Sequence, residues 1–376
     1  MDEATLSWGD TRPESVRILA NEYADRHSTS EEVQPTLYLC FRLSRRLGIG
    51  FRSKPRYLVA FLLPFGLALI PALVIAAVVG QWATIPLLSW FVVTAAIGAS
   101  YSVAAPLVQA ASDNIVSLHR ALAREEEIHR LMAQDRRWFN VRTCSAVSVA
   151  LALGLTAILY VLQRYIGSVP MQAGTLWINA YLFYVLTEES YLSLAIFVEA
   201  HNMSVCHYQL YGLSPIDSLA LKRAVRGYNQ VGAIFVLALT LVAFLFVLVL
   251  PADPNLIAAF VISLLLVEYL VCALGFLGPR LFLGRIVRVK KEQEMEPLRG
   301  ELNGLLARLK ELTEEEYDRM KRLQETHDAI RDSSENLLPL GDLAKVVGAL
   351  ALSTLTVVAT ALADAYLAEW VKPFLP

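Results

Sequence analysis

The sequence predicts an all-α polytopic membrane protein with about seven transmembrane helices, which form three hairpins and a final single span. Two observations carry this prediction. Of the 376 residues, 56% are hydrophobic and 18% are charged, whereas soluble domains carry about 25% charged residues. The charged residues also gather in a few polar blocks, and the apolar stretches between them are long enough to cross a hydrocarbon core of about 30 Å as helices of about 20 residues.

Seven apolar stretches qualify as spans of the lipid bilayer. They cover residues 57–80, 83–111, 144–166, 174–199, 229–250, 255–279 and 345–371. The second is long enough to project beyond the bilayer. Because the first begins only at Tyr57, after a polar segment with acidic residues, we expect no cleaved signal peptide.

The Lys and Arg residues predict the orientation, since cytoplasmic loops carry an excess of them. Of the 33, all but Arg164 and Lys372 lie in segments 1–56, 112–143, 200–228 and 280–345. We therefore expect a plasma (inner) membrane protein with a cytoplasmic N-terminus and an external C-terminus. The expected order is a basic cytoplasmic segment, 1–56; a six-helix region, 57–279, with cytoplasmic linkers 112–143 and 200–228; a cytoplasmic helical hairpin, 280–344; and the last span with a short external C-terminus, 345–376.

The polar segment before the last span is expected to form two helices. Its leucines recur at steps of four and three residues, as in a short heptad seam of a coiled coil; they are Leu298, Leu302, Leu305, Leu309 and Leu312. The seam breaks at Thr313, which has capping-box spacing to Glu316. The hairpin is either a spacer or a surface, centred on Leu302, Leu305 and Leu309, for a homo-oligomer or a cytoplasmic protein partner.

Acidic residues within the spans are the main functional candidates, because a charge in hydrocarbon is costly unless it is paired, protonated or hydrated. Glu188 and Glu189 lie near the middle of the fourth span, and Glu268 lies about halfway along the sixth. At about 1.5 Å per residue, Glu188 is about 18 Å and Glu268 about 15 Å from the expected cytoplasmic helix ends, so the acids can share one layer. No Lys, Arg or His lies in the interior of any expected span, away from its ends, so we expect these carboxylates to be protonated, to face water or to meet cations.

The fourth span is also the most polar, with Thr187 and Tyr191 beside the two acids. A helix built in this way is not expected to face lipid all round. It predicts either a water-lined surface that attracts cations or a buried helix whose polar groups bond to its neighbours. Pro64 and Pro71 in the first span are candidates for a gating hinge, although prolines in membrane helices usually only bend them.

Several enzyme chemistries find no support in the sequence. The four cysteines form no CxxC pair, and the Walker, GxGxxG and HExxH motifs are absent. His201, Cys206 and His207 are more typical of loop residues than of metal ligands. We therefore expect no enzyme activity, no metal site and no cofactor, and the formal net charge of −2 excludes nucleic-acid binding based on overall basicity.

Three functions remain, in decreasing order of expectation. The first is an ion channel or channel-like transport protein for inorganic cations, formed by an oligomer or by the single bundle, in which Glu188, Glu189 and Glu268 attract cations or relay protons. The second is a membrane-embedded sensor or effector that receives a signal from a partner through its cytoplasmic hairpin. The third is an intramembrane enzyme that acts on a lipid, which would need a cluster of His, Asp or Glu near one membrane face, and the sequence has no clear cluster of that kind.

Overall fold

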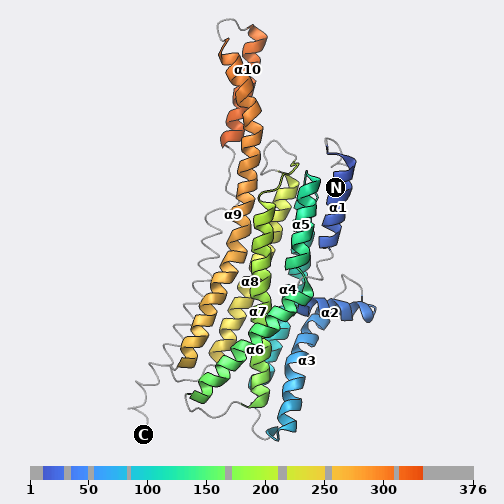
Figure 1. Ribbon diagram of the computed structural model, residues 1–376, viewed down its shortest axis with the longest axis vertical. Helices are drawn as coiled ribbons and strands as arrows, with labels where there is room; N and C mark the ends of the chain where they lie inside the picture. The colour runs from blue at the N-terminus through green and yellow to red at the C-terminus, as the bar shows by residue number, and fades with distance from the viewer. Residues whose placement is uncertain are drawn as a thin grey trace.

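The computed structural model describes residues 12–28, 35–49, 55–82, 86–165, 172–210, 218–249, 256–308 and 313–332. Within these ranges every named element is an α-helix, which confirms the all-α class. The helices are α1 (Glu14–Ser28), α2 (Pro35–Arg46), α3 (Pro55–Val78), α4 (Leu87–His119), α5 (Glu125–Trp138), α6 (Val141–Tyr165), α7 (Ala173–Met203), α8 (Leu219–Val249), α9 (Leu256–Leu306) and α10 (Glu314–Asp332). Figure 1 shows a bundle of long helices, from one end of which α9 and α10 project.

Five stretches of the described chain are long and apolar enough to cross a membrane. They lie in α3, in α4, in α5 with α6 (residues 125–165), in α7 and in the part of α9 that begins at Ile262. Five of the seven expected spans fall on these helices. The expected span 229–250 falls on α8, whose side chains are described only up to Ile234, and the expected span 345–371 lies outside the described residues.

The helix α3 is apolar along its length and begins with Pro55, whose fixed backbone angle suits the first turn of a helix. Pro64 and Pro71 both lie inside α3, and the helix continues through them. A membrane helix tolerates internal prolines when neighbouring helices support the freed backbone groups, and α3 packs against α2, α4 and α7. A hinge at these two prolines therefore stays a prediction.

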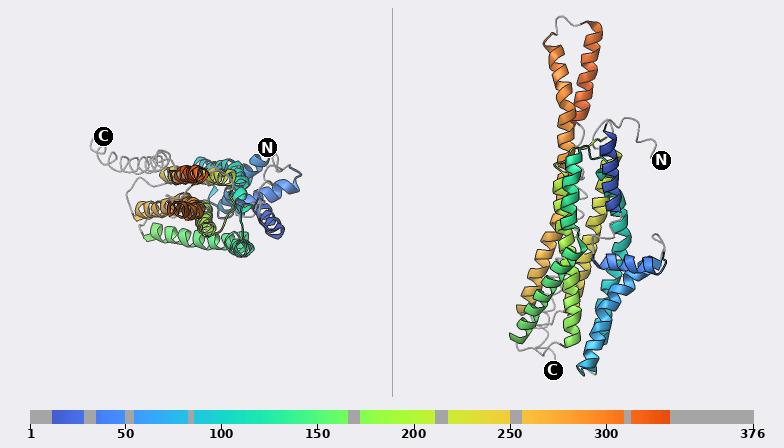
Figure 2. Two further views of the ribbon diagram at one scale, coloured as in Figure 1. Left: turned by 90° about the horizontal axis from the view of Figure 1, so that it is seen from above. Right: turned by 45° about the vertical axis from the view of Figure 1, so that its right-hand side comes forward.

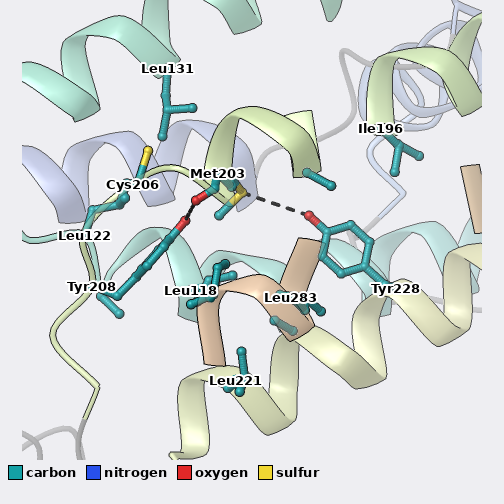
Figure 3. Close-up of a cluster of buried hydrophobic side chains, with 14 of the residues drawn as sticks. Leu118, Leu122, Leu131, Ile196, Met203, Cys206, Tyr208, Leu221, Tyr228 and Leu283 are labelled. Atoms are coloured by element: carbon teal, nitrogen blue, oxygen red, sulfur yellow. Dashed lines mark hydrogen bonds between the residues drawn. The ribbon is translucent and has the colours of Figure 1, made fainter. Parts of the chain in front are cut away.

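The buried side chains form one cluster at each end of the bundle. The apolar-end core joins α2, α3, α4, α6, α7 and α9 around residues such as Trp90, Ile97 and Phe183. The polar-end core joins α1, α4, α5, α7, α8 and α9, and part of it is drawn in Figure 3, where Leu118 and Met203 lie near its centre. Because the polar helices α1 and α5 cover it and point charged side chains outward, this end of the bundle is built like a water-soluble domain.

The short helix α2 lies beside the beginning of α3. Figure 2 shows that α2 runs across the direction of the long helices. The guanidinium carbon of Arg56, in the first turn of α3, lies 3.6 Å from the centre of the Phe41 ring of α2. Such a cation–π contact fixes α2 at the level where α3 begins.

The helix α9 is a single helix of 51 residues, which makes it about 77 Å long. The expected sixth span ends at residue 279, but α9 continues without a break through Pro279, so the span and the first helix of the expected hairpin are one helix. A Cβ atom on Gly278 would lie 2.3 Å from Cδ2 of Phe197, and one on Gly275 would lie 2.9 Å from Cβ of Ser193. This close packing on α7 supports the helix across Pro279, although the proline removes one backbone hydrogen bond.

The helix α10 packs against α9, and Figure 1 shows it running back along the end of α9. The change of helix falls where the leucine seam was expected to break, and the predicted capping box is present. The N–H of Glu316 donates to the Thr313 hydroxyl at 3.3 Å, and the N–H of Thr313 donates to the Glu316 carboxylate at 3.0 Å. Of the central seam residues, Leu305 is buried and Leu302 is half-buried, while Leu309 lies outside the described residues.

Candidate functional site

Glu188 of α7 is completely buried, and its carboxylate accepts hydrogen bonds from two other helices. The N–H of Thr36 donates to Oε1 at 2.8 Å, and the hydroxyl of Thr36 donates to Oε2 at 2.7 Å. The hydroxyl of Tyr101, on α4, donates to Oε2 at 2.9 Å. Glu188 therefore joins α7 to both α2 and α4.

The first turn of α2 is well suited to hold a carboxylate. Pro35 is the first residue of α2 and Thr36 the second, so the N–H of Thr36 has no acceptor within its own helix. Free N–H groups at a helix N-terminus carry partial positive charge and bind anions. Thr36 thus partners the buried acid with a backbone group and a hydroxyl in place of a basic side chain.

Cys40 follows Thr36 by about one turn of α2 and is fully buried. Burial raises the pKa of its thiol to about 12, and the nearby negative charge of Glu188 adds to the rise. The thiol is therefore protonated at neutral pH. Because the thiolate is the reactive form of cysteine, Cys40 serves here as a small packing residue rather than as a nucleophile.

Glu189 and Glu268 form a second acidic group, at the interface between α7 and α9. Their exposed fractions are 8% and 5%. The hydroxyl of Ser190 donates to Oε2 of Glu268, whereas Oε1 of Glu268 has no hydrogen-bond partner within the described part of the chain. The charges of Glu268 and Glu188 both act on Glu189, so the three acids lie in one region.

The acid layer, formed by Glu188, Glu189 and Glu268, lies level with the first turns of α3. The hydroxyl of Ser102, next to Tyr101, donates to the carbonyl of Tyr57 at 3.1 Å. The expected depths of Glu188 and Glu268 assume that their spans end at Ala200 and Gly278. In the structure Ala200 belongs to the polar-end core, and α9 continues beyond Gly278. The structure thus places the acids nearer to one end of the apolar section than those depths suggested.

Thr187 and Tyr191 lie on either side of the acids along α7, but their polar groups point to other partners. The Thr187 hydroxyl donates to the carbonyl of Phe183 at 2.9 Å and to that of Ser148, on α6, at 3.1 Å. The ring of Tyr191 lies 6.4 Å from that of Trp138, the last residue of α5. In this arrangement Thr187 joins α7 to α6, and Tyr191 lies against α5.

The polar-end core contains a further set of buried polar side chains, which the sequence pattern did not predict. Nε2 of His119 lies 3.1 Å from Oε1 of Glu199, and both side chains are buried. The ring of Tyr23 packs 4.9 Å from that of His119, and its hydroxyl donates to Asp135. Burial, followed by the charge of Asp135, holds the pKa of Tyr23 well above its usual value. These contacts attach α1, from the expected N-terminal segment, to α5, from the expected linker 112–143, and to the long helices α4 and α7.

Two further contacts in the same core join its elements through Met203 (Figure 3). The Tyr208 hydroxyl donates to the carbonyl of Met203 at 2.6 Å, and the Tyr228 hydroxyl lies 3.9 Å from its sulfur.

The three residues considered as metal ligands each have another neighbour. His201 packs on Phe282, Cys206 lies near Arg130, and His207 pairs with Glu127 at 2.7 Å. Among the described residues, no group of three or more His, Cys, Asp or Glu side chains is placed to hold a metal ion.

Comparisons of the chain with protein-family models, with curated proteins and with solved structures found no match.

Proposed function

We propose that this membrane protein is an ion channel or channel-like transport protein for inorganic cations, protons included. The observation that carries the proposal is the pair Glu189 and Glu268, two buried carboxylates on the packed helices α7 and α9, with the charge of Glu268 acting on Glu189. Neither forms an ion pair with a described residue. Two carboxylates in a dry site do not both stay ionised without a counter-ion, so the pair is suited to exchange a proton or a small cation.

Within this proposal the two adjacent glutamates of α7 have different tasks. Adjacent helical residues point about 100° apart, and Glu188 faces α2 and α4 while Glu189 feels the charge of Glu268 on α9. Glu188 already has three hydrogen bonds, so we assign it to positioning α2. Glu189 and Glu268, with Ser190 between them, then form the ion-exchanging step.

The proposed topology follows the distribution of basic residues. In this topology the polar-end core, with α1 and α5, lies in the cytoplasm, and the helices around the apolar-end core cross the plasma (inner) membrane, so that their far ends lie outside. The full proposal has seven spans, with the fifth in α8 and the seventh at 345–371, and the C-terminus outside. We also propose that the chain assembles into a homo-oligomer.

Cation flux into liposomes tests the pathway. Glu189→Gln and Glu268→Gln keep the shape of the side chains and remove their charge, so flux should fall by about tenfold or more in each. Glu292→Gln is the matched control, because Glu292 is an exposed acid on the same helix α9. Flux that stays at the wild-type rate in both buried-site variants would exclude this pair from the pathway.

A second candidate function is a sensor or effector, and the continuity of α9 favours it. The same helix carries Glu268 in the bundle and Leu305 in the projecting part beside α10. Replacing Leu302 and Leu305 with Ser should loosen this projection. If it transmits a signal, hydrogen exchange should also change around Glu268; if it is only a spacer, the change should stay within α10 and the last turns of α9. Wild-type protein that passes no cation at any voltage or pH would favour the sensor.

A further inference from the structure

The helix α2 has an apolar stripe that the rest of the described protein leaves open. Leu39, Leu43 and Leu47 recur every four residues, and 47%, 37% and 62% of their surfaces are exposed. The four-residue spacing places all three on one side of the helix. The helix has 12 residues and is followed by a turn, so these three large aliphatic side chains form one exposed row. An exposed apolar row of this kind indicates contact with an apolar partner or a membrane.

The stripe lies next to the buried face of α2. At about 100° per residue, Leu39 and Leu43 lie on one flank of the face that buries Cys40 and Ser44 against the bundle. Arg42 and Arg45 lie on the far side and are exposed. The apolar part of the α2 surface is thus wider than the part that the protein covers, and exposed arginines lie beyond it.

The position of α2 matches that of a helix at a membrane surface. It runs across the long helices (Figure 2) and touches the first turn of α3 through Phe41 and Arg56. The helix α3 is one of the stretches long enough to cross a membrane. A helix that lies across the start of a membrane span is in the plane of the headgroups, where apolar side chains reach the acyl chains and basic ones stay at the surface.

The charge of α2 selects the kind of lipid. Arg42, Arg45 and Arg46 are all exposed, and no acidic residue lies within α2. Clusters of basic residues on an amphipathic helix bind anionic headgroups. We propose that α2 is a lipid-binding helix that inserts Leu39, Leu43 and Leu47 among the acyl chains and holds anionic headgroups with its three arginines.

This binding would control the contact between Thr36 and Glu188. Thr36 is at the N-terminus of α2, and its two hydrogen bonds to Glu188 require α2 to lie in one position against α7. Anionic lipid that holds α2 in this position stabilises the contact, and loss of the lipid weakens it. The effect of lipid on Glu188 rests on the proposed function. The lipid contact of α2 rests only on the membrane location of the protein.

Fluorescence quenching in nanodiscs tests the lipid contact on the full chain. Leu43→Cys and Arg42→Cys each place one bimane label on α2, and the labelled wild type sets the background because its four cysteines are buried. We expect brominated acyl chains to quench the label at position 43 and aqueous iodide to quench the label at position 42. Quenching at position 43 by iodide would overturn the proposal. Protection of that label from both quenchers would also overturn it, since a second copy of the chain would then cover the stripe.

The headgroup preference is tested by comparing brominated phosphatidylglycerol with brominated phosphatidylcholine in mixed nanodiscs. With the label at position 43, the anionic lipid should be enriched near α2 by about fivefold or more. The triple change of Arg42, Arg45 and Arg46 to Gln should abolish the enrichment while the circular dichroism spectrum stays unchanged. Equal quenching by the two lipids without the triple change would overturn headgroup binding. No readout here is an ion flux, so these results are independent of the channel test.

Discussion

Thr36 donates its backbone N–H and its hydroxyl to opposite oxygens of Glu188. The two residues are separated by 152 positions in the sequence. A buried carboxylate is stable only when hydrogen bonds or charges replace its lost water. The relationship therefore makes the position of α2 and the state of an acid inside the bundle depend on each other.

Loss of either side-chain donor to Glu188 should destabilise the protein. Hydrogen bonds to a charged group contribute about 1.5–3 kcal/mol, so Thr36→Val and Tyr101→Phe should each lower the free energy of unfolding by about that amount. Both hydroxyls donate to the same oxygen, Oε2, so their contributions are coupled. The loss of unfolding free energy in the double variant should therefore differ from the sum of the two single losses. Unfolding in mixed micelles measures all three variants.

Thr156→Val is the control for this series. The Thr156 hydroxyl donates only to its own helix, to the carbonyl of Ala152 at 2.7 Å. Its loss should leave stability nearly unchanged. Equal destabilisation by Thr156→Val and Thr36→Val would show that the contact with Glu188 has no special contribution.

Cys40 should be unreactive toward maleimide in the folded protein. Its pKa is raised to about 12 by burial and by the charge of Glu188, so a rise from pH 7 to pH 9 leaves the thiol protonated, whereas an ordinary cysteine with a pKa of about 8.5 becomes mostly ionised. A cysteine at the exposed position of Arg42, on the polar side of the same helix, should show that ordinary increase. Rapid labelling of Cys40 at pH 7 would contradict the buried position of α2.

Gly278→Ala should weaken the packing of α9 on α7. The added Cβ would lie 2.3 Å from Phe197, and overpacking of this kind costs about 1–3 kcal/mol. Gly154→Ala, on α6, is the matched control because no atom lies within 4 Å of its added Cβ. It should be neutral or slightly stabilising in a thermal unfolding assay. The reverse order of the two variants would show that α9 does not pack closely at Gly278.

The first turn of α10 should open as the pH falls. The N–H and the hydroxyl of Thr313 bond to the Glu316 carboxylate and hold the pKa of Glu316 below its usual value. A depressed carboxyl pKa stabilises the folded state above the unfolded value of about 4.3, and this contribution is lost as the pH falls through the folded value. Hydrogen exchange of α10, corrected for intrinsic rates, measures the opening. Thr313→Ala should open the turn at all pH values and remove most of the pH dependence.

Local patterns predicted the elements better than their arrangement. Apolar runs placed α3, α6 and α7 to within a few residues, and the spacing of Thr313 and Glu316 predicted the start of α10. The partners of Glu188 were not predictable. Thr36 lies in a segment that has no apolar run long enough to cross a membrane, and only tertiary packing brings it to α7. The continuity of α9 through Pro279 has the same cause, since the glycines that pack on α7 override the local effect of the proline.

The length of α9 has a mechanical consequence. From Glu268 to Leu306 the helix continues for 38 residues without interruption, a lever arm of about 57 Å. A tilt of about 10° at the acid layer would swing its far end by about 10 Å, a displacement comparable to the width of a helix. A small rearrangement around one carboxylate is thus amplified into a movement large enough to engage or release another macromolecule. In the opposite direction, a force applied at the far end of α9 acts on the surroundings of Glu268 through the same lever arm.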